Sequence, residues 1–298
     1  MKMTRGNFGE LLIPYHKKVF FKTWEGLEKQ YPKIATVYDM TKAEDTFPHI
    51  GDFGMWRSNT EGNTINSSSI TEGDTAALVA ERFDEGYDVT WELVRDDQYD
   101  IFSGMGKNGS ASGLAYGLQT RVETNIANII NNGFANTGYD GTSLFSANHP
   151  LYDSNEVGNN LATGALNPAN LKLGMTKMRQ QVNNANELIA MRPKQLVVGP
   201  ELEWTAKEIV KSVNQAFEMT NTKNVIEGLD PVIMDYITGT KWILRDTNPM
   251  WQNITLGWRD KVAFDKSQIP RTLDWFYYGY TRFSYGYVSW RGLVGSAG

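Results

Sequence analysis

The sequence predicts an α+β protein, and three observations lead to this fold class. A long amphipathic helical pattern begins near Ser110, apolar and polar residues alternate around Tyr87, and an aromatic-rich run extends from Trp275 to Trp290. These patterns do not alternate regularly along the chain, as they would in a parallel α/β sheet. With 298 residues, 41% of them hydrophobic, the chain can bury a large core in one domain or two.

The first 45 residues predict a basic arm. Residues 1–45 contain eight lysine and arginine residues. Within this segment, large apolar side chains recur at steps of three and four residues, at Phe20, Trp24, Leu27 and Tyr31. Because this spacing places them on one face of a helix, we expect a clamp-like arm or a short helix here.

The next segment predicts an extended hairpin. From Thr46 to Thr75 the chain is polar and glycine-rich, so it has too little apolar surface to form a core and must project or lie on another surface. Its glycines are Gly51, Gly54, Gly62 and Gly73. The run that follows has the period of a half-buried strand, with apolar residues at Tyr87, Val89, Trp91 and Leu93.

The clearest helical pattern follows this strand. Ser110 can cap a helix of about six turns, and Gly133 can end it in a left-handed conformation. The apolar positions of this helix share one face: Leu114, Leu118, Val122, Ile126 and Ile129.

Shorter helices and strands are expected in the second half of the chain. Asn167 and Pro168 begin a helix whose apolar positions are Leu171, Met175, Met178 and Val182. A short strand follows at Leu196–Val198, and Pro200 begins another helix with Glu201 and Glu203 in its first turn, where acids are favourable. Residues 251–298 hold twelve of the 36 aromatic residues, so we expect Trp275–Trp290 to be a long strand buried against helix and sheet.

Charge is distributed unevenly along the chain. The net charge is −5, but the segment from Glu44 to Asp100 has fourteen acidic and three basic residues, so it carries −11 and the remainder +6. One interpretation is that complementary surfaces meet between copies of the chain. The other is a solvated acidic loop.

The sequence offers little support for an enzyme or a metal site. The chain has no cysteine, and its three histidines, His16, His49 and His149, are far apart with no metal-binding spacing. His149 precedes Pro150, so we expect it to form local hydrogen bonds in a rigid turn. Asp96 and Asp97 are adjacent and point in different directions. We therefore expect no catalytic residue, no metal and no cofactor.

A glycine motif and the hydropathy pattern do not indicate a cofactor site or a membrane segment. Gly104, Gly106 and Gly109 match a dinucleotide-binding fingerprint, but Ile129 and Ile130 stand where a ribose-binding acid is needed, so a hinge is the better interpretation. The apolar cluster Leu11–Ile13 stops at Pro14, and no run of eighteen apolar residues occurs. We expect neither export nor membrane insertion.

Three stretches, taken in order, resemble a known family. They are DGTSLFSANHP at Asp140–Pro150, RPKQLVVGPELEWTAKEIVKS at Arg192–Ser212, and RFSYGYVSWRGLVGS at Arg282–Ser296. Together they resemble the major capsid proteins of tailed bacteriophages, especially the Mu-like head subunits.

This resemblance implies a Hong Kong 97-type capsid fold and a mechanical function. Residues 1–45 would be the N-terminal arm and 46–100 the extended loop. The peripheral domain would comprise 101–164 and 250–298, with the helix from Ser110 as its spine, and the axial domain 165–249. The protein would form hexamers and pentamers in the icosahedral or prolate head shell around the phage DNA.

The resemblance also implies partners. We expect a separate scaffolding protein, because about 45 residues before the loop are too few for a fused one. A portal, decoration proteins and packaged DNA, contacted non-specifically at the inner surface, complete the set. The protein would be located in the virion, after assembly in the host cytoplasm. No lysine occurs between Lys42 and Lys107, so we expect no lysine–asparagine isopeptide bond from the loop.

We expect contacts between subunits at one residue of the arm and six of the loop: Trp24, Met55, Trp56, Arg57, Glu61, Glu72 and Asp74. Two alternatives stay open. An encapsulin-type nanocompartment would share the fold. A hydrolase that uses His149 with a nearby carboxylate would need a concave pocket with convergent titratable groups.

Overall fold

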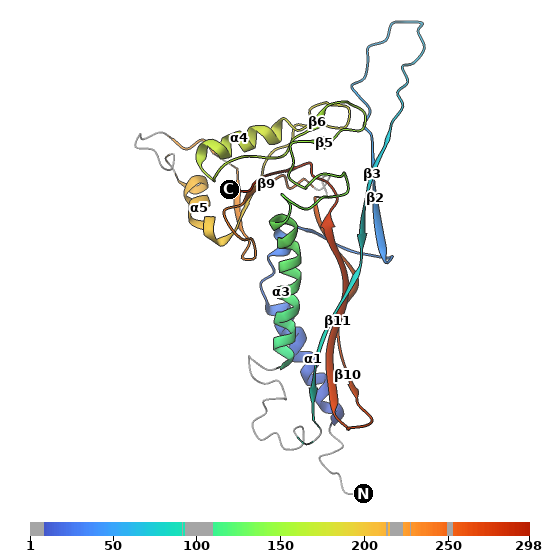
Figure 1. Cartoon of the computed structure of the whole chain (residues 1–298), viewed down its shortest axis with the longest axis vertical. Helices are drawn as coiled ribbons and strands as arrows, with labels where there is room; N and C mark the ends of the chain where they lie inside the picture. The colour runs from blue at the N-terminus through green and yellow to red at the C-terminus, as the bar shows by residue number, and fades with distance from the viewer. Residues whose placement is uncertain are drawn as a thin grey trace.

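The computed structural model describes residues 9–90, 92, 110–212, 214, 223–226, 228–248 and 253–298. The chain forms an elongated α+β subunit in which two four-stranded sheets are joined through a long central helix, with a hairpin projecting beyond the body (Figure 1). The predicted α+β class is confirmed. The glycine motif at Gly104–Gly109 and the pair Asp96 and Asp97 lie outside the described residues.

The first sheet has the order β1-β10-β11-β4. Its strands are β1 (Thr36–Asp39), β10 (Ile254–Gln268), β11 (Trp275–Tyr287) and β4 (Glu81–Val89). Two helices, α1 (Gly9–Gly26) and α3 (Ser110–Asn131), lie along this sheet and pack against each other (Figure 1). The expected helix at Ser110 and the expected long aromatic strand are both confirmed.

The second sheet has the order β12-β9-β7-β8. Its strands are β12 (Leu293–Ser296), β9 (Trp242–Arg245), β7 (Gln195–Val198) and β8 (Asp230–Ile233). Two helices pack against this sheet, α4 (Pro168–Arg179) and α5 (Glu203–Lys211). The short helix η3 (Pro200–Leu202) leads into α5. The Asn167 side chain accepts a hydrogen bond from Asn170 N, which confirms the predicted cap of α4.

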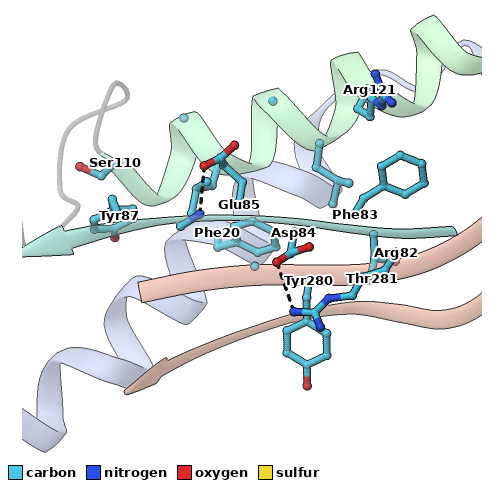
Figure 2. A pocket seen from close by; sticks show the side chains of 16 residues that line it. Phe20, Arg82, Phe83, Asp84, Glu85, Tyr87, Ser110, Arg121, Tyr280 and Thr281 are labelled. Atoms are coloured by element: carbon cyan, nitrogen blue, oxygen red, sulfur yellow. Dashed lines mark hydrogen bonds and ion pairs between the residues drawn. The ribbon is translucent and has the colours of Figure 1, made fainter. Parts of the chain in front are cut away.

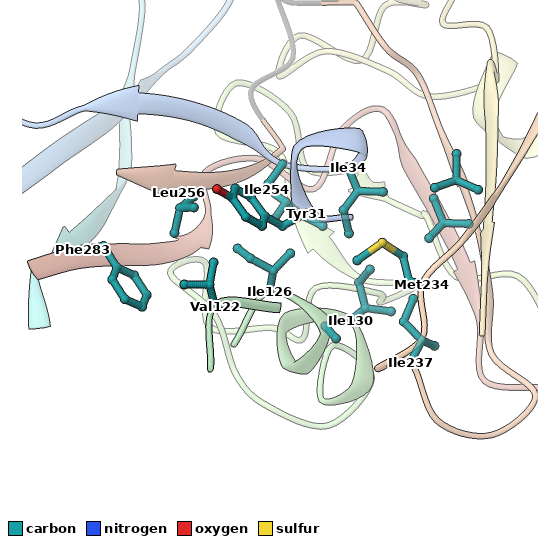
Figure 3. Packing of buried hydrophobic residues seen from close by; sticks show 14 of the residues in the cluster. Tyr31, Ile34, Val122, Ile126, Ile130, Met234, Ile237, Ile254, Leu256 and Phe283 are labelled. Carbon is teal, nitrogen blue, oxygen red and sulfur yellow. The ribbon is translucent and has the colours of Figure 1, made fainter. Parts of the chain in front are cut away.

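The side chains of β7 alternate between the two faces of the second sheet, and each face packs against a different hydrophobic core. Val197 belongs to the core that also contains Val122, Ile126 and Ile130 of α3, whereas Leu196 and Val198 belong to a second core with residues of α4 and α5. Successive strand side chains point to opposite faces, so the sheet is covered on both. Figure 3 shows the first core, where α3 meets the short helix η2 (Tyr31–Lys33), the β10 and β11 strands, and Met234 and Ile237.

The hairpin differs from the prediction. Its strands are β2 (Glu44–Ile50) and β3 (Glu72–Val79), which pair with each other, while β4, with Tyr87 and Val89, pairs with β11 in the first sheet. The expectation that the Tyr87 strand belongs to the hairpin is therefore wrong. Tyr87 lies directly opposite Tyr277, and this stacked aromatic cross-strand pair stabilises the pairing of β4 with β11.

The segment 250–298 contributes strands to both sheets, because β12 pairs with β9 in the second. One further expectation is corrected. Gly133 does not adopt a left-handed conformation. Its lack of a side chain matters for a different reason, since a Cβ there would lie 2.8 Å from Ile129 O and 3.1 Å from the Phe145 ring. A small antiparallel pair, β5 (His149–Pro150) and β6 (Val157–Gly158), follows this turn.

A buried carboxylate lies in the middle of α3. Glu123 is 2% exposed, and its Oε1 accepts hydrogen bonds from Gln30 N and Gln119 Nε2, each at 2.7 Å. Its Oε2 has no partner among the described residues. Burial raises the pKa of Glu123, although hydrogen bonds from the backbone of Gln30 and Tyr31 oppose this effect.

This arrangement predicts a pH-dependent effect of Glu123→Gln. Because the pKa is raised by folding, the contribution of Glu123 to the free energy of unfolding falls as the pH rises from the unfolded value near 4.5 through the folded value. The variant lacks this loss, so its stability relative to the wild type should be greater at pH 7 than at pH 4. Urea unfolding of the isolated subunit measures this, with exposed Glu156→Gln as control. An equal difference at both pH values would refute the prediction.

Candidate assembly surface

The tip of the hairpin, residues 52–72, is the most exposed part of the described chain. Every residue in this range is exposed, and the tip extends beyond the body (Figure 1). Large apolar side chains are among them: Phe53 is 61% exposed, Met55 79%, Trp56 99% and Ile65 92%. Clustered apolar exposure of this kind is typical of an interaction surface.

The apolar residues of the tip do not cover one another. The two sides of the loop enclose an open cavity of about 420 Å³ whose lining includes Phe53, Met55, Trp56 and Ile65. A tryptophan that remains almost wholly in water leaves a large apolar area available for burial on association. The tip therefore has the chemistry of a contact that is completed by another molecule.

Six of the predicted contact residues lie on this hairpin. Met55, Trp56, Arg57 and Glu61 are in the tip, and Glu72 and Asp74 are on β3 at its base. Asp74 already has a partner, since its Oδ2 accepts a hydrogen bond from Tyr152 Oη at 3.1 Å.

Trp24 does not join these residues. It is 8% exposed and packs edge-on against Trp258, with Lys29 Nζ 4.7 Å from its ring centroid. The helical spacing that drew attention to Trp24 in the sequence is the spacing that turns a residue toward the core. We therefore leave Trp24 out of the assembly surface.

The acidic segment has few partners within the subunit. Among the described residues, the one ion pair that involves an acid of residues 44–90 joins Arg82 to Asp84, both on β4. On α1, Lys17, Lys18 and Lys22 are exposed, and the ion pairs found in the described part of the chain do not include them. Within the described part of the chain, these three lysines and the acids of this segment other than Asp84 therefore have no ion-pair partner in the subunit.

A groove that the sequence did not reveal lies between α3 and β4 (Figure 2). It has a volume of about 670 Å³, and Phe83 and Tyr87 on β4 and Leu114 and Leu118 on α3 contribute to its walls. Gly113 and Gly117, one turn apart on α3, open it, because a Cβ at either position would have no neighbour within 4 Å. The pair Gly113 and Gly117 is the feature of the sequence from which this groove could have been predicted.

His149 lies in a closed structural network. It is fully buried, its Nδ1 is 2.6 Å from Asp140 Oδ2, and its Nε2 is 3.1 Å from Asn160 Oδ1. Its ring stacks on Trp290 with centroids 4.3 Å apart. Burial alone would raise the pKa of Asp140, but the hydrogen bond and charge of His149 hold it below its usual value.

All three histidines are packed within the subunit. His149 is fully buried and lines none of the three cavities described for this chain. The other histidines are also packed against aromatic rings, His16 on Tyr277 and His49 on Tyr139. Within the described residues, no cluster of histidine and acidic side chains could hold a metal ion, and no helix is long and apolar enough to cross a membrane.

Comparison with known proteins identifies the class of molecule. A phage capsid protein family matches residues 74–296, most of the chain. The chain belongs to this family. It is a structural major capsid protein of the phage head shell and not an enzyme, so the hydrolase alternative is wrong. No curated protein matches the sequence.

Solved structures share the Hong Kong 97-type fold. The procapsid protein of bacteriophage JBD30 is 16% identical, with a TM-score of 0.52 over 99% of this chain and 76% of that one. The protein of Mycobacterium phage Bobi is 12% identical, with a TM-score of 0.54 over 91% and 90%. A virus-like particle from Pyrococcus furiosus is 11% identical, with a TM-score of 0.53 over 95% and 98%. At these identities the similarity establishes the fold.

Proposed function

We propose that each subunit joins the shell by placing the tip of its hairpin on a neighbouring subunit. The observation that carries this proposal is that every residue from 52 to 72 is exposed, with Trp56 at 99%. Met55, Trp56 and Arg57 supply the apolar and cationic centre of the contact, and Glu61, Glu72 and Asp74 supply its acidic edge. Aromatic residues, Met and Arg are the types enriched at protein interfaces.

Because the same contact is repeated around the shell, a modest contact is sufficient to hold each subunit in place. In a closed shell of hexamers and pentamers, each subunit both extends its hairpin and receives one, so several modest contacts must break before a subunit can leave. In the terms of the fold, the β2–β3 hairpin is the extended loop, the first sheet with α3 is the peripheral domain, and the second sheet with α4 and α5 is the axial domain. Residues 1–45, the proposed arm, include α1 and β1, which pack with the first sheet, and the first two residues of β2.

The remaining partners follow from this function. We infer that a separate scaffolding protein guides assembly in the host cytoplasm, that a portal and decoration proteins join the shell, and that the inner surface contacts packaged DNA without sequence preference. An encapsulin-type compartment has the same fold, and the Pyrococcus furiosus particle is similar over nearly its full length. The phage capsid family match favours the phage shell.

Charge complementarity predicts that assembly depends on salt. The unpaired acids of the hairpin would meet cations such as Lys17, Lys18 and Lys22 on a neighbour. Each exposed pair contributes only about 0–1 kcal/mol, but a shell repeats it at every equivalent contact. Because added salt screens such pairs, wild-type assembly should weaken as ionic strength rises.

Charge reversal tests this directly. Glu61→Lys combined with Glu72→Lys should impair assembly at low salt, and higher salt should relieve the new repulsion. Asp74 is left unchanged in this variant because the Tyr152 hydroxyl donates a hydrogen bond to it. Light scattering across a salt series measures both proteins. If neither responds to salt, the acidic segment is a solvated surface.

A further inference from the structure

Several hydrogen bonds hold the base of the hairpin to the body, and one carboxylate, that of Asp153, contacts both sides of it. Asp153 Oδ2 accepts a hydrogen bond from Asp52 N at 2.9 Å, and its Oδ1 accepts one from Thr71 N at 3.2 Å. Asp52 and Thr71 lie on opposite sides of the hairpin, where Gly51 N also donates to Thr71 O at 2.8 Å. We call residues 50–52 and 71–74 the neck. The Asp153 side chain thus bridges the two sides of the neck.

Two glycines allow this close approach. A Cβ on Gly51 would lie 1.9 Å from Asp153 Oδ2, and a Cβ on Gly73 would lie 2.4 Å from the Tyr152 ring. Neither glycine has a positive φ, so backbone conformation does not require them. Their role is to let the two sides of the neck lie directly against residues 152 and 153.

A second anchor holds the outgoing side of the neck. Asn184 N donates to Asp52 Oδ2 at 2.9 Å, and Asn184 Nδ2 donates to Ile50 O at 3.1 Å. The Asn184 side chain is itself fixed, because its Oδ1 accepts a hydrogen bond from Arg291 Nη2 at 2.6 Å. Arg291 is 6% exposed and donates from Nε to Val182 O at 3.0 Å. The neck is therefore tied to the buried interior of the subunit.

We propose that Asp153 is a positioning residue for assembly, which fixes the direction in which the hairpin tip points. Beyond the neck, every residue from 53 to 70 is exposed, and Met55 N donates a hydrogen bond to Glu187 Oε1 of the body, so the neck and this adjacent contact set where the tip is presented. A subunit whose tip is already oriented loses less conformational freedom when it docks. This inference rests on the proposed function, because it concerns the same hairpin.

The orientation of the tip can be measured on the isolated subunit. The chain has no cysteine, so Ser58→Cys in the tip and Leu173→Cys on α4 give two unique sites for spin labels. Double electron–electron resonance between the two labels should give a narrow distance distribution in the protein that carries no other substitution. Asp153→Ala should broaden it, and Gly51→Ala should do the same by displacing the carboxylate. Glu156→Ala, which removes an equal charge from an exposed site three residues away, should leave it narrow.

Assembly provides the second readout. Asp153→Ala should slow shell formation by about tenfold, because the tip must be ordered during docking. Its thermal unfolding should stay close to that of the wild type. Asp153→Asn keeps one acceptor oxygen and should restore part of the rate. Because both substitutions remove the same contact, the effects of Gly51→Ala and Asp153→Ala should not add.

The outcomes separate this inference from the proposed function. An unchanged, narrow distance distribution in Asp153→Ala would overturn the positioning role, whatever the assembly result. A broadened distribution with an unchanged assembly rate would also overturn it, because orientation would then not matter for docking. Failure of the proposed function would be seen differently, as unimpaired shells in variants that lack the hairpin tip.

Discussion

Replacing residues 53–70 with a short glycine-serine turn should abolish closed shells and leave the subunit folded. None of these residues is buried, and the neck contacts of Asp52 and Thr71 with Asp153 are kept in this design. The apolar side chains removed, with Trp56 at 99% exposure, can be buried only by another molecule. Negative-stain electron microscopy of the assembly reaction and thermal unfolding of the subunit measure the two effects.

The single substitution Trp56→Ala is the milder form of this experiment. It should reduce the yield of shells with no change in the unfolding midpoint, since an exposed side chain contributes little to folding. Normal shells from the protein without its tip would show that the hairpin is not the contact.

Trp290→Ala should have the opposite effect, a large loss of subunit stability. Trp290 is 2% exposed, its ring lies against His149, and Gly158 approaches so closely that a Cβ there would be 2.3 Å from it. Removing the indole leaves a cavity in a packed core, which costs about 3–5 kcal/mol of the free energy of unfolding. Tyr285→Ala should cost less, because Tyr285 is only partly buried.

The matched control for Trp290 is Trp56, which has the same chemistry and opposite burial. Urea unfolding of the two isolated variants should give a midpoint far below the wild type for Trp290→Ala and an unchanged midpoint for Trp56→Ala. Equal midpoints for the two variants would mean that core and assembly surface are not separate in this protein.

Local signals in the sequence were sufficient for several elements. The predicted helix from Ser110 is present as α3, the Asn167 cap and Pro168 place α4 correctly, and β7 occupies the short apolar run before Pro200. Each of these depends on residues a few positions apart. The long strand β11 was also predictable, because a dense aromatic run has few other places to be buried.

Pairing between distant segments could not be predicted in this way. Both β3 and β4 have strand patterns, and only the fold shows that β3 returns to β2 while β4 joins β11, nearly 200 residues later. The neck is a similar case, since Asp52 and Asp153 are 101 residues apart in sequence. Trp24 was misassigned for a local reason. Its helical spacing alone could not show whether it faces the core or the solvent, and the side chain is buried.

Cryo-electron microscopy of shells assembled from the purified protein with its scaffold tests the central claim most directly. We expect uniform closed shells in which residues 52–72 of one subunit lie on the next, with the Trp56 side chain buried between them. Small soluble oligomers, or closed shells in which Trp56 stays in solvent and the tip contacts no neighbour, would contradict the account.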